Sequence, residues 1–410
     1  MNFLNTNLLS FKLLIMATAC VSIVSLFVYL NSDNFGTDDE AKSINVITYD
    51  DEDKIFKTNN PLVDKIFSVC GKDIQCTIGG MQYFAETENK ETILKTVDGL
   101  VLAYAKEGIF CHHQVHSLGK FLYTYTGDLR EALSHSNQKC GGALYHGVVE
   151  SFFSTQKFFD KSKIENMDII NVCPEDHKNT NSLQRWQCIH GIGHGLSIVY
   201  DYNILSAVTR CEEFDSRFEE LSCSKGVFME NTLHYFYTKE GDFEKDNIFY
   251  PCNIVDKKFA PACYHYHTLY LNHQRDVSVY DGGFEECDKI EPKEFVKYCY
   301  YGLGKELAYD VYDKMPTSIP ICQQGDPQLH SYCFTGLLLT LVNGWGTDHA
   351  FEYCKILPTK FKIDCYDGLG KWIHMKHSTD VERKQECLKA NSEKYYNVCI
   401  KSNLDNLELL

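Results

Sequence analysis

The pattern of apolar and polar positions divides the 410-residue chain into three parts. Residues 13–30 read LLIMATACVSIVSLFVYL and contain no charge, so one helix of this length would cross the ~30 Å apolar core of a bilayer. Residues 31–60 hold eight acidic residues and three lysines with little apolar periodicity, which is typical of a solvated linker. Over 61–410, apolar and aromatic residues fall mostly at helical spacing, which predicts a folded helical domain.

The charges on either side of the apolar segment predict its orientation. Lys12 precedes the segment, whereas four acidic residues follow it between positions 33 and 40. The positive-inside rule therefore places residues 1–12 in the cytoplasm and the helical domain outside it. We expect a single-pass protein of the cell membrane that contacts the bilayer through residues 13–30 as an uncleaved signal anchor. A cleaved signal peptide is the alternative, although no A-x-A-like site follows the apolar run.

The 19 cysteines favour an oxidising compartment. Cys20 lies inside the apolar segment, which leaves eighteen, an even number as a disulfide framework requires. Zinc ligation is the alternative, but zinc sites favour C-x2-4-C spacing and the chain has none. The simplest pairing is local: Cys70–Cys76, Cys111–Cys140, Cys173–Cys188, Cys211–Cys223, Cys252–Cys263, Cys287–Cys299, Cys322–Cys333, Cys354–Cys365 and Cys387–Cys399.

The cysteine spacing also reveals a repeat. In the last seven pairs the second cysteine recurs after 32 to 40 residues, a period typical of stacked helical hairpins. Each second cysteine begins a related segment, such as CIHGIGHGL at 188 and CYYGLGKEL at 299, whose glycine at the third following position would let a neighbouring helix approach closely. Polar breaks such as Ser378-Thr379-Asp380 predict the N-cap of a second helix. We therefore expect an all-α fold of disulfide-braced hairpins that forms an open solenoid or a closed α/α toroid.

Residues 90 to 400 resemble the disulfide-linked helical repeat proteins of the Sel1-like and tetratricopeptide type. The resemblance rests on the period near 35, the recurring G-x-G and the GDLREAL stretch at 127–133. The cysteine spacing and the histidines depart from the usual Sel1-like pattern. What the resemblance implies is a helical solenoid that binds a ligand on its concave face.

Composition and charge exclude several classes of protein. A hydrophobic content of 44% is sufficient for a packed domain, which excludes general disorder. The net charge of -16 and the lack of a basic run argue against nucleic-acid binding. The G-x-G triplets recur with the helical repeat and do not follow a strand, so we assign them to helix packing rather than to a nucleotide loop. No G-x-S-x-G nucleophile motif occurs.

The candidate chemistry lies in His and Glu residues that share a helix face. Residues four apart on a helix can chelate one ion together, and four consecutive units contain such a pair: His112/His116, His146/Glu150, His190/His194 and Glu230/His234. His146 and His194 both stand six residues after the cysteine of their unit, and Lys305 occupies that position in a later unit. Since equivalent positions of a solenoid point the same way, we expect these side chains to line one wall.

These residues suggest a transition-metal site, with Zn, Fe, Cu or Mn as the ion. The predicted ligands are His113, His116, His146, His190, His194 and His234. We expect Glu150 and Glu230 to serve as further ligands or as a general base, and Lys305 to hold an anionic group of a substrate. His265 and His267 are two apart and should diverge on their helix, so we expect them to pack against neighbours.

Two functions are compatible with this pattern. The first is a membrane-anchored extracytoplasmic protein that binds a metal, as a metal-dependent hydrolase or oxidase. The second is a non-catalytic scaffold or adhesion module that binds a small molecule, a glycan or a protein on a concave face. In that case the histidines would hydrogen-bond neighbouring tyrosines or carbonyl groups.

Overall fold

The computed structural model describes residues 60–106, 111–174 and 182–404. The chain divides into two compact units, Met1–Ile55 and Phe56–Leu410, and every described residue belongs to the second. The predicted membrane segment and most of the acidic linker lie outside the described residues. Within the described ranges, no helix is long and apolar enough to cross a membrane.

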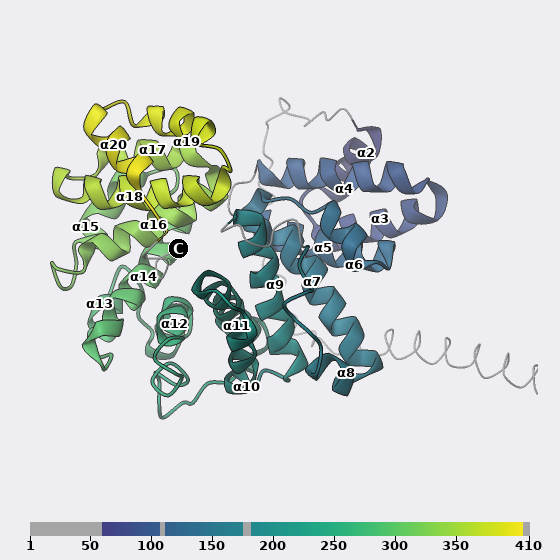
Figure 1. The fold of residues 1–410 in the computed structure, drawn as a ribbon, viewed down its shortest axis with the longest axis horizontal. Coiled ribbons are helices and arrows are strands. Elements are labelled where there is room, and N and C mark those ends of the chain that lie inside the picture. Colours follow the sequence, from purple (N-terminus) through teal and green to yellow (C-terminus); the bar gives the residue numbers. More distant parts are fainter. Residues whose placement is uncertain (1–59, 107–110, 175–181, 405–410) are drawn as a thin grey trace, which may run out of the picture. The chain divides into compact units, whose positions relative to one another are not determined.

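The described chain is helical (Figure 1), and its β structure is limited to isolated bridges between Ser278 and residues 281 and 282. The principal α-helices of the described chain are α2 (Pro61–Cys70), α3 (Ile74–Thr87), α4 (Lys90–Ala105), α5 (Cys111–Thr126), α7 (Lys139–Phe159), α9 (Leu183–Val199), α11 (Arg217–Thr238), α12 (Ala260–Arg275), α14 (Val296–Val311), α16 (His330–Trp345), α18 (Thr359–Lys376) and α20 (Glu393–Lys401). The α-helices in the segments that connect them are α6 (Leu129–Ser134), α8 (Lys161–Glu165), α10 (Ile204–Thr209), α13 (Gly283–Cys287), α15 (Ser318–Cys322), α17 (Thr347–Ile356) and α19 (Asp380–Cys387). Short 3₁₀ turns are η3 (Arg210–Glu213), η4 (Lys293–Phe295), η5 (Met315–Thr317) and η6 (Leu388–Ala390).

A repeat of one long and one short helix runs through the array. The long helices α5, α7, α9, α11, α12, α14, α16 and α18 pack against one another in chain order, and short helices such as α17 and α19 connect them. The side chain of Thr379 caps α19 in a capping box with Glu382, where the polar break predicted an N-cap. The prediction of all-α hairpin repeats is confirmed, and the arrangement is consistent with Sel1-like repeats.

Nine disulfides brace the array, and they are the nine local pairs that the spacing predicts. Cys354 of α17, for example, is joined to Cys365 of α18 with their Cα atoms 5.6 Å apart. A bridge that closes a loop of this size stabilises a fold by about 3 kcal/mol in the chain-entropy account. Because bonded sulfurs are not available as thiolate ligands, these cysteines leave metal chemistry to other side chains. So many disulfides also indicate an oxidising, extracytoplasmic location.

The long helices pack with their backbones in contact at the recurring glycines. A Cβ atom on Gly226 of α11 would lie 2.0 Å from the carbonyl oxygen of His190 on α9. In return, a Cβ atom on Gly193 of α9 would lie 2.1 Å from the carbonyl oxygen of Cys223. The same reciprocal contact joins α14 and α16. Only glycine permits this approach, so the G-x-G triplets serve helix packing as predicted.

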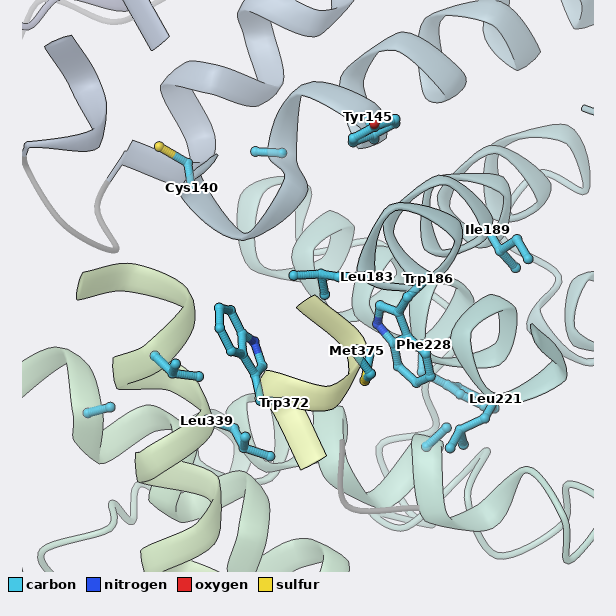
Figure 2. Close-up of a cluster of buried hydrophobic side chains, with 14 of the residues drawn as sticks. Cys140, Tyr145, Leu183, Trp186, Ile189, Leu221, Phe228, Leu339, Trp372 and Met375 are labelled. Carbon is cyan, nitrogen blue, oxygen red and sulfur yellow. The ribbon is translucent and has the colours of Figure 1, made fainter. Parts of the chain in front are cut away.

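The repeats also bring early and late helices together. Helix α16 contacts α7, and α18 contacts α9, although several repeats separate them along the chain. Figure 2 shows Trp372 and Met375 of α18 beside Leu183 and Trp186 of α9. The long helices therefore enclose a common interior.

We predict that Gly226→Ala destabilises the fold by about 1–3 kcal/mol or more, because the new methyl group overlaps the backbone of α9. Gly79→Ala on α3 is the matched control, since a Cβ atom there meets nothing within 4 Å, and it should stabilise by up to about 1 kcal/mol. Urea denaturation of both variants measures the difference. Equal free energies of unfolding would contradict the close packing of α9 and α11.

Candidate metal centre

The long helices surround a cavity of about 600 Å³. The residues that line the cavity follow the sequence repeat. Residues that stand 2, 6 or 10 positions after the second cysteine of a unit recur among them. His146 and Glu150 contribute from α7, and Tyr301, Lys305 and Tyr309 contribute from α14. Residues four apart on a helix share one face, and glycine packing aligns that face from one helix to the next. His146 and Lys305 of the predicted wall line this cavity, whereas His194 is fully buried and is not part of its lining.

Five histidine rings meet at one end of the cavity, and we call them the histidine cluster. They are His112 and His116 of α5, His146 of α7, and His190 and His194 of α9. Neighbouring ring centroids are 4.8–6.0 Å apart. The tightest group is His146, His190 and His194, which are buried and offer one ligand atom each, all within 4.8 Å of one another.

Hydrogen bonds from neighbouring helices orient two of these rings. His194 donates from Nδ1 to Oε2 of Glu230 at 2.7 Å, and the hydroxyl of Tyr202 donates to Oε1 of the same carboxylate at 3.3 Å. Nε2 of His146 lies 2.9 Å from Oε1 of Gln187. A carboxylate or amide oxygen behind an imidazole is the usual outer partner of a metal-ligating histidine, because it fixes the tautomer and the ring orientation.

The other oriented rings are His112 and His190. Nδ1 of His112 donates to the carbonyl oxygen of Cys140 at 2.8 Å, and Nε2 of His190 lies 3.4 Å from Sδ of Met229. Residues 140–142 have positive φ values and form a left-handed turn at the start of α7. This turn, which the CGG sequence favours, directs the Cys140 carbonyl toward α5.

The remaining nitrogen of each oriented ring is buried and has no hydrogen-bond partner among the residues that the structure describes. These atoms are His112 Nε2, His146 Nδ1, His190 Nδ1 and His194 Nε2. Buried polar atoms are normally paired. In a neutral ring of this kind the hydrogen-bonded nitrogen carries the proton, so the other nitrogen has a free lone pair, which is the form that binds a metal ion. The donor set therefore fits a transition metal.

Burial keeps four rings of the cluster neutral. It lowers the pKa of His112 to about 4 and lowers the pKa of His116, His146 and His190 well below the ordinary histidine value, and nearby positive groups add to the effect. Neutral imidazoles do not have to lose a proton before they bind a metal. Two members of the tightest group, His146 and His190, are therefore in the form that can bind a metal at neutral pH.

Two carboxylates beside the cluster differ in proton affinity. Glu150 forms an ion pair with Lys120, and its Oε2 lies 3.3 Å from Nε2 of His116. Burial raises the pKa of Glu150, and the negative charge of Glu230 raises it further. Burial also acts to raise the pKa of Glu230, but the hydrogen bond and the charge of His194 outweigh it and lower that pKa. Two carboxyl groups whose pKa values are shifted in opposite directions within one cavity are a common arrangement for proton transfer.

The other predicted site residues also line the cavity but lie outside the group of three. His113 is exposed, with its ring 6.0 Å from that of Tyr237. His234 stacks on Tyr202 at 3.6 Å between ring centroids. Lys305 projects over the ring of Tyr266. Their functional roles remain predictions.

Sequence reasoning missed residues that occupy the second position after a repeat cysteine. His265 stands two residues after Cys263, as His190 does after Cys188, and it lines the cavity instead of only packing. Lys225 holds the same position in its unit and also lines the cavity. The repeat register contains this signal. By contrast, Nε2 of His267 lies 2.6 Å from the carbonyl oxygen of Ile248, so His267 is a packing residue, as expected.

A comparison of the chain with models of known protein families, with curated proteins and with solved structures finds no match. The cavity and the chemistry of the residues around it are therefore the observations that bear on function.

We predict that Glu230→Leu lowers the free energy of unfolding by about 1–3 kcal/mol, because it removes the acceptor of His194 Nδ1 and of the Tyr202 hydroxyl. The pKa of Glu230 is lowered in the fold, so its ionised form stabilises the folded protein at pH values above the ordinary pKa of a carboxyl group. This contribution to the free energy of unfolding is lost as the pH falls through the lowered pKa. Glu86→Leu, at an exposed position of α3, is the control. Denaturation at neutral and acidic pH measures both effects, and a deficit that does not shrink in acid would contradict this role.

Proposed function

We propose that the protein is an extracytoplasmic metalloprotein in which His146, His190 and His194 bind one transition-metal ion. The observation that carries this proposal is the convergence of three buried imidazoles whose ligand atoms lie within 4.8 Å of one another. Imidazole donors favour zinc, copper or iron over calcium and magnesium, which prefer oxygen ligands. His112, His116 and Glu230 surround this set and would adjust its orientation and charge.

The surroundings favour a catalytic ion over a structural one. Three protein ligands are one fewer than the four of a structural zinc site, and two of the three, His146 and His190, line a cavity of about 600 Å³. When bound, the ion would polarise a substrate or activate a water molecule. Glu150, whose pKa is raised, is suited to accept or donate a proton beside it. These features support a metal-dependent hydrolase.

The identity of the metal separates hydrolysis from oxidation. The same imidazole donors suit copper or iron, so recovery of a redox-active metal would favour an oxidase. The nine disulfides support placement outside the cytoplasm. The membrane anchor at residues 13–30 is part of the proposal and would keep the helical domain at the outer face of the cell membrane.

We predict that the full-length protein, produced in an oxidising compartment with metals supplied, retains about one equivalent of a transition metal. The double variant His190→Ala/His194→Ala should lose nearly all of it, since two of three ligands are removed. Elemental analysis measures the content. His273→Ala, which removes an exposed histidine at the end of α12, should leave the content unchanged.

Two results would reject the metal centre. One is wild-type protein that carries far less than one equivalent of any transition metal. The other is a double variant with the same metal content as the wild type. The first result would favour the alternative function, a scaffold or adhesion module that binds a glycan or a protein.

A further inference from the structure

The part of the cavity wall that α16 and α18 form is uncharged. The residues that these two helices contribute to the lining are Leu339, Thr340, Asn343, Gly344, Trp372 and Met375. The ionisable side chains of the lining, which are histidines, glutamates, lysines and tyrosines, come from the helices α5 to α14. A ligand that fills the cavity therefore meets polar side chains at one end and an uncharged surface at the other.

Trp372 of α18 gives the uncharged surface an aromatic ring. Its side chain lines the cavity and is 8% exposed. The indole nitrogen donates to Oδ1 of Asn343 at 3.0 Å, and the ammonium nitrogen of Lys376 lies 5.1 Å from the ring centroid. The polar group of the indole is thus satisfied within the protein, so what the ring offers to a ligand is apolar contact.

A second tryptophan and two methionines extend this aromatic surface. Trp186 of α9 lines the cavity and is 7% exposed, and Figure 2 shows it beside Trp372 and Met375. Met229 of α11 also lines the cavity. Thioether sulfur makes favourable contacts with aromatic rings, and aromatic rings favour one another beyond the area that they bury. The combination therefore favours a ligand with an aromatic group.

The aromatic surface is continuous with the histidine cluster. Trp186 stands four residues before His190 on α9 and so shares its helix face. Asn343, which accepts the indole hydrogen bond, lies beside the left-handed turn of α7. A Cβ atom on Gly141 of that turn would be 4.0 Å from Cβ of Asn343 and 3.4 Å from Nδ1 of His112. An aromatic group on this surface would therefore lie next to the imidazoles.

His265 of α12 offers the cavity a polar group that no protein atom satisfies. It lines the cavity and is 5% exposed, and neither of its ring nitrogens has a hydrogen-bond partner among the described residues. Its ring stacks on Tyr266 at 4.3 Å between centroids, and Tyr266 in turn lies 6.4 Å from the ring of His190. His190 thus has Trp186 on its own helix face and the pair Tyr266 and His265 nearby, so one flexible molecule can reach both.

The chemistry of His265 indicates which polar group suits it. Burial lowers the pKa of His265 well below the ordinary histidine value, and two nearby lysines add to the effect. A neutral imidazole has one N–H donor and one nitrogen acceptor. A hydroxyl group both donates and accepts, so it can pair with His265 in either tautomer.

We infer that the cavity binds an aromatic alcohol whose ring lies against Trp186 and Trp372 and whose hydroxyl group pairs with His265. A cavity of about 600 Å³, lined by aromatic side chains and a few polar groups, is typical of small-molecule sites. The inference names the class of substrate for the proposed metalloenzyme, and only the position of the reacting group beside the ion rests on that proposed function. Binding of the alcohol uses none of the three proposed metal ligands.

Fluorine NMR of the full-length protein labelled with fluorotryptophan tests this inference, because the chain has only three tryptophans. Trp186 and Trp372 line the cavity, whereas Trp345 is not part of the lining and stacks on Tyr312 at 4.6 Å between centroids. We expect phenethyl alcohol to shift the signals of Trp186 and Trp372 saturably and that of Trp345 far less. If neither cavity tryptophan shifts saturably, the inference is wrong.

An analogue and a variant test the ring and the hydroxyl group separately. Cyclohexylethanol lacks the aromatic ring and should bind about threefold more weakly than phenethyl alcohol. His265→Phe keeps a ring and removes both nitrogens, so it should weaken phenethyl alcohol about fivefold and leave binding of propylbenzene, which has no hydroxyl group, unchanged. His273→Phe, at an exposed histidine of the same helix, is the matched control. Cyclohexylethanol that binds as tightly as phenethyl alcohol would overturn the inference, as would His265→Phe protein that binds phenethyl alcohol like the wild type.

The same titrations on metal-loaded and on chelator-treated protein separate this inference from the metal centre. We expect the shifts of Trp186 and Trp372 in both states. Protein that retains no metal but binds phenethyl alcohol would reject the metal centre and support the aromatic site. Protein that retains metal but shows no saturable shift would do the opposite.

Discussion

The contact between helix backbones at the repeated glycines is the constraint on which the rest of the structure depends. Gly193 and Gly226 allow α9 and α11 to meet with backbone atoms almost in contact, and a side chain at either position would separate the helices. The carbonyl that meets Gly226 belongs to His190, so a ligand of the proposed metal centre lies at the crossing point itself. Close packing therefore determines how near the imidazoles of neighbouring helices approach.

The disulfides and the glycines have complementary roles. The glycines hold the long helices together around the cavity, whereas seven of the nine bridges each tie a connecting segment to the helix that follows it. Because the bonded cysteines are not free to act as nucleophiles or thiolate ligands, the polar chemistry of the interior is left to histidine, glutamate, lysine and tyrosine. Side chains of these four types line one cavity.

Much of this arrangement follows from the sequence because the relevant spacing is local. All nine disulfides join cysteines that are 6 to 29 residues apart, and the fixed period places His146 and His194 in one register. The contacts between distant repeats are different. That α16 meets α7, and that Lys225 and His265 share a cavity with the histidine cluster, depends on small rotations that accumulate over several repeats. No local pattern encodes that sum, although the repeat register, which places His265 two residues after its cysteine as it does His190, marks His265 as a residue that can face the interior.

The central claim is that helix packing at glycines converts repeated histidines into one all-imidazole metal site. X-ray absorption spectroscopy of the zinc-loaded full-length protein tests it most directly, because the method reports the atoms bound to the ion. We predict that the atoms nearest to the zinc ion are nitrogen or oxygen at about 2.0–2.1 Å, with scattering from three imidazole rings at longer distances. Sulfur at about 2.3 Å, or a first shell without imidazole scattering, would contradict it.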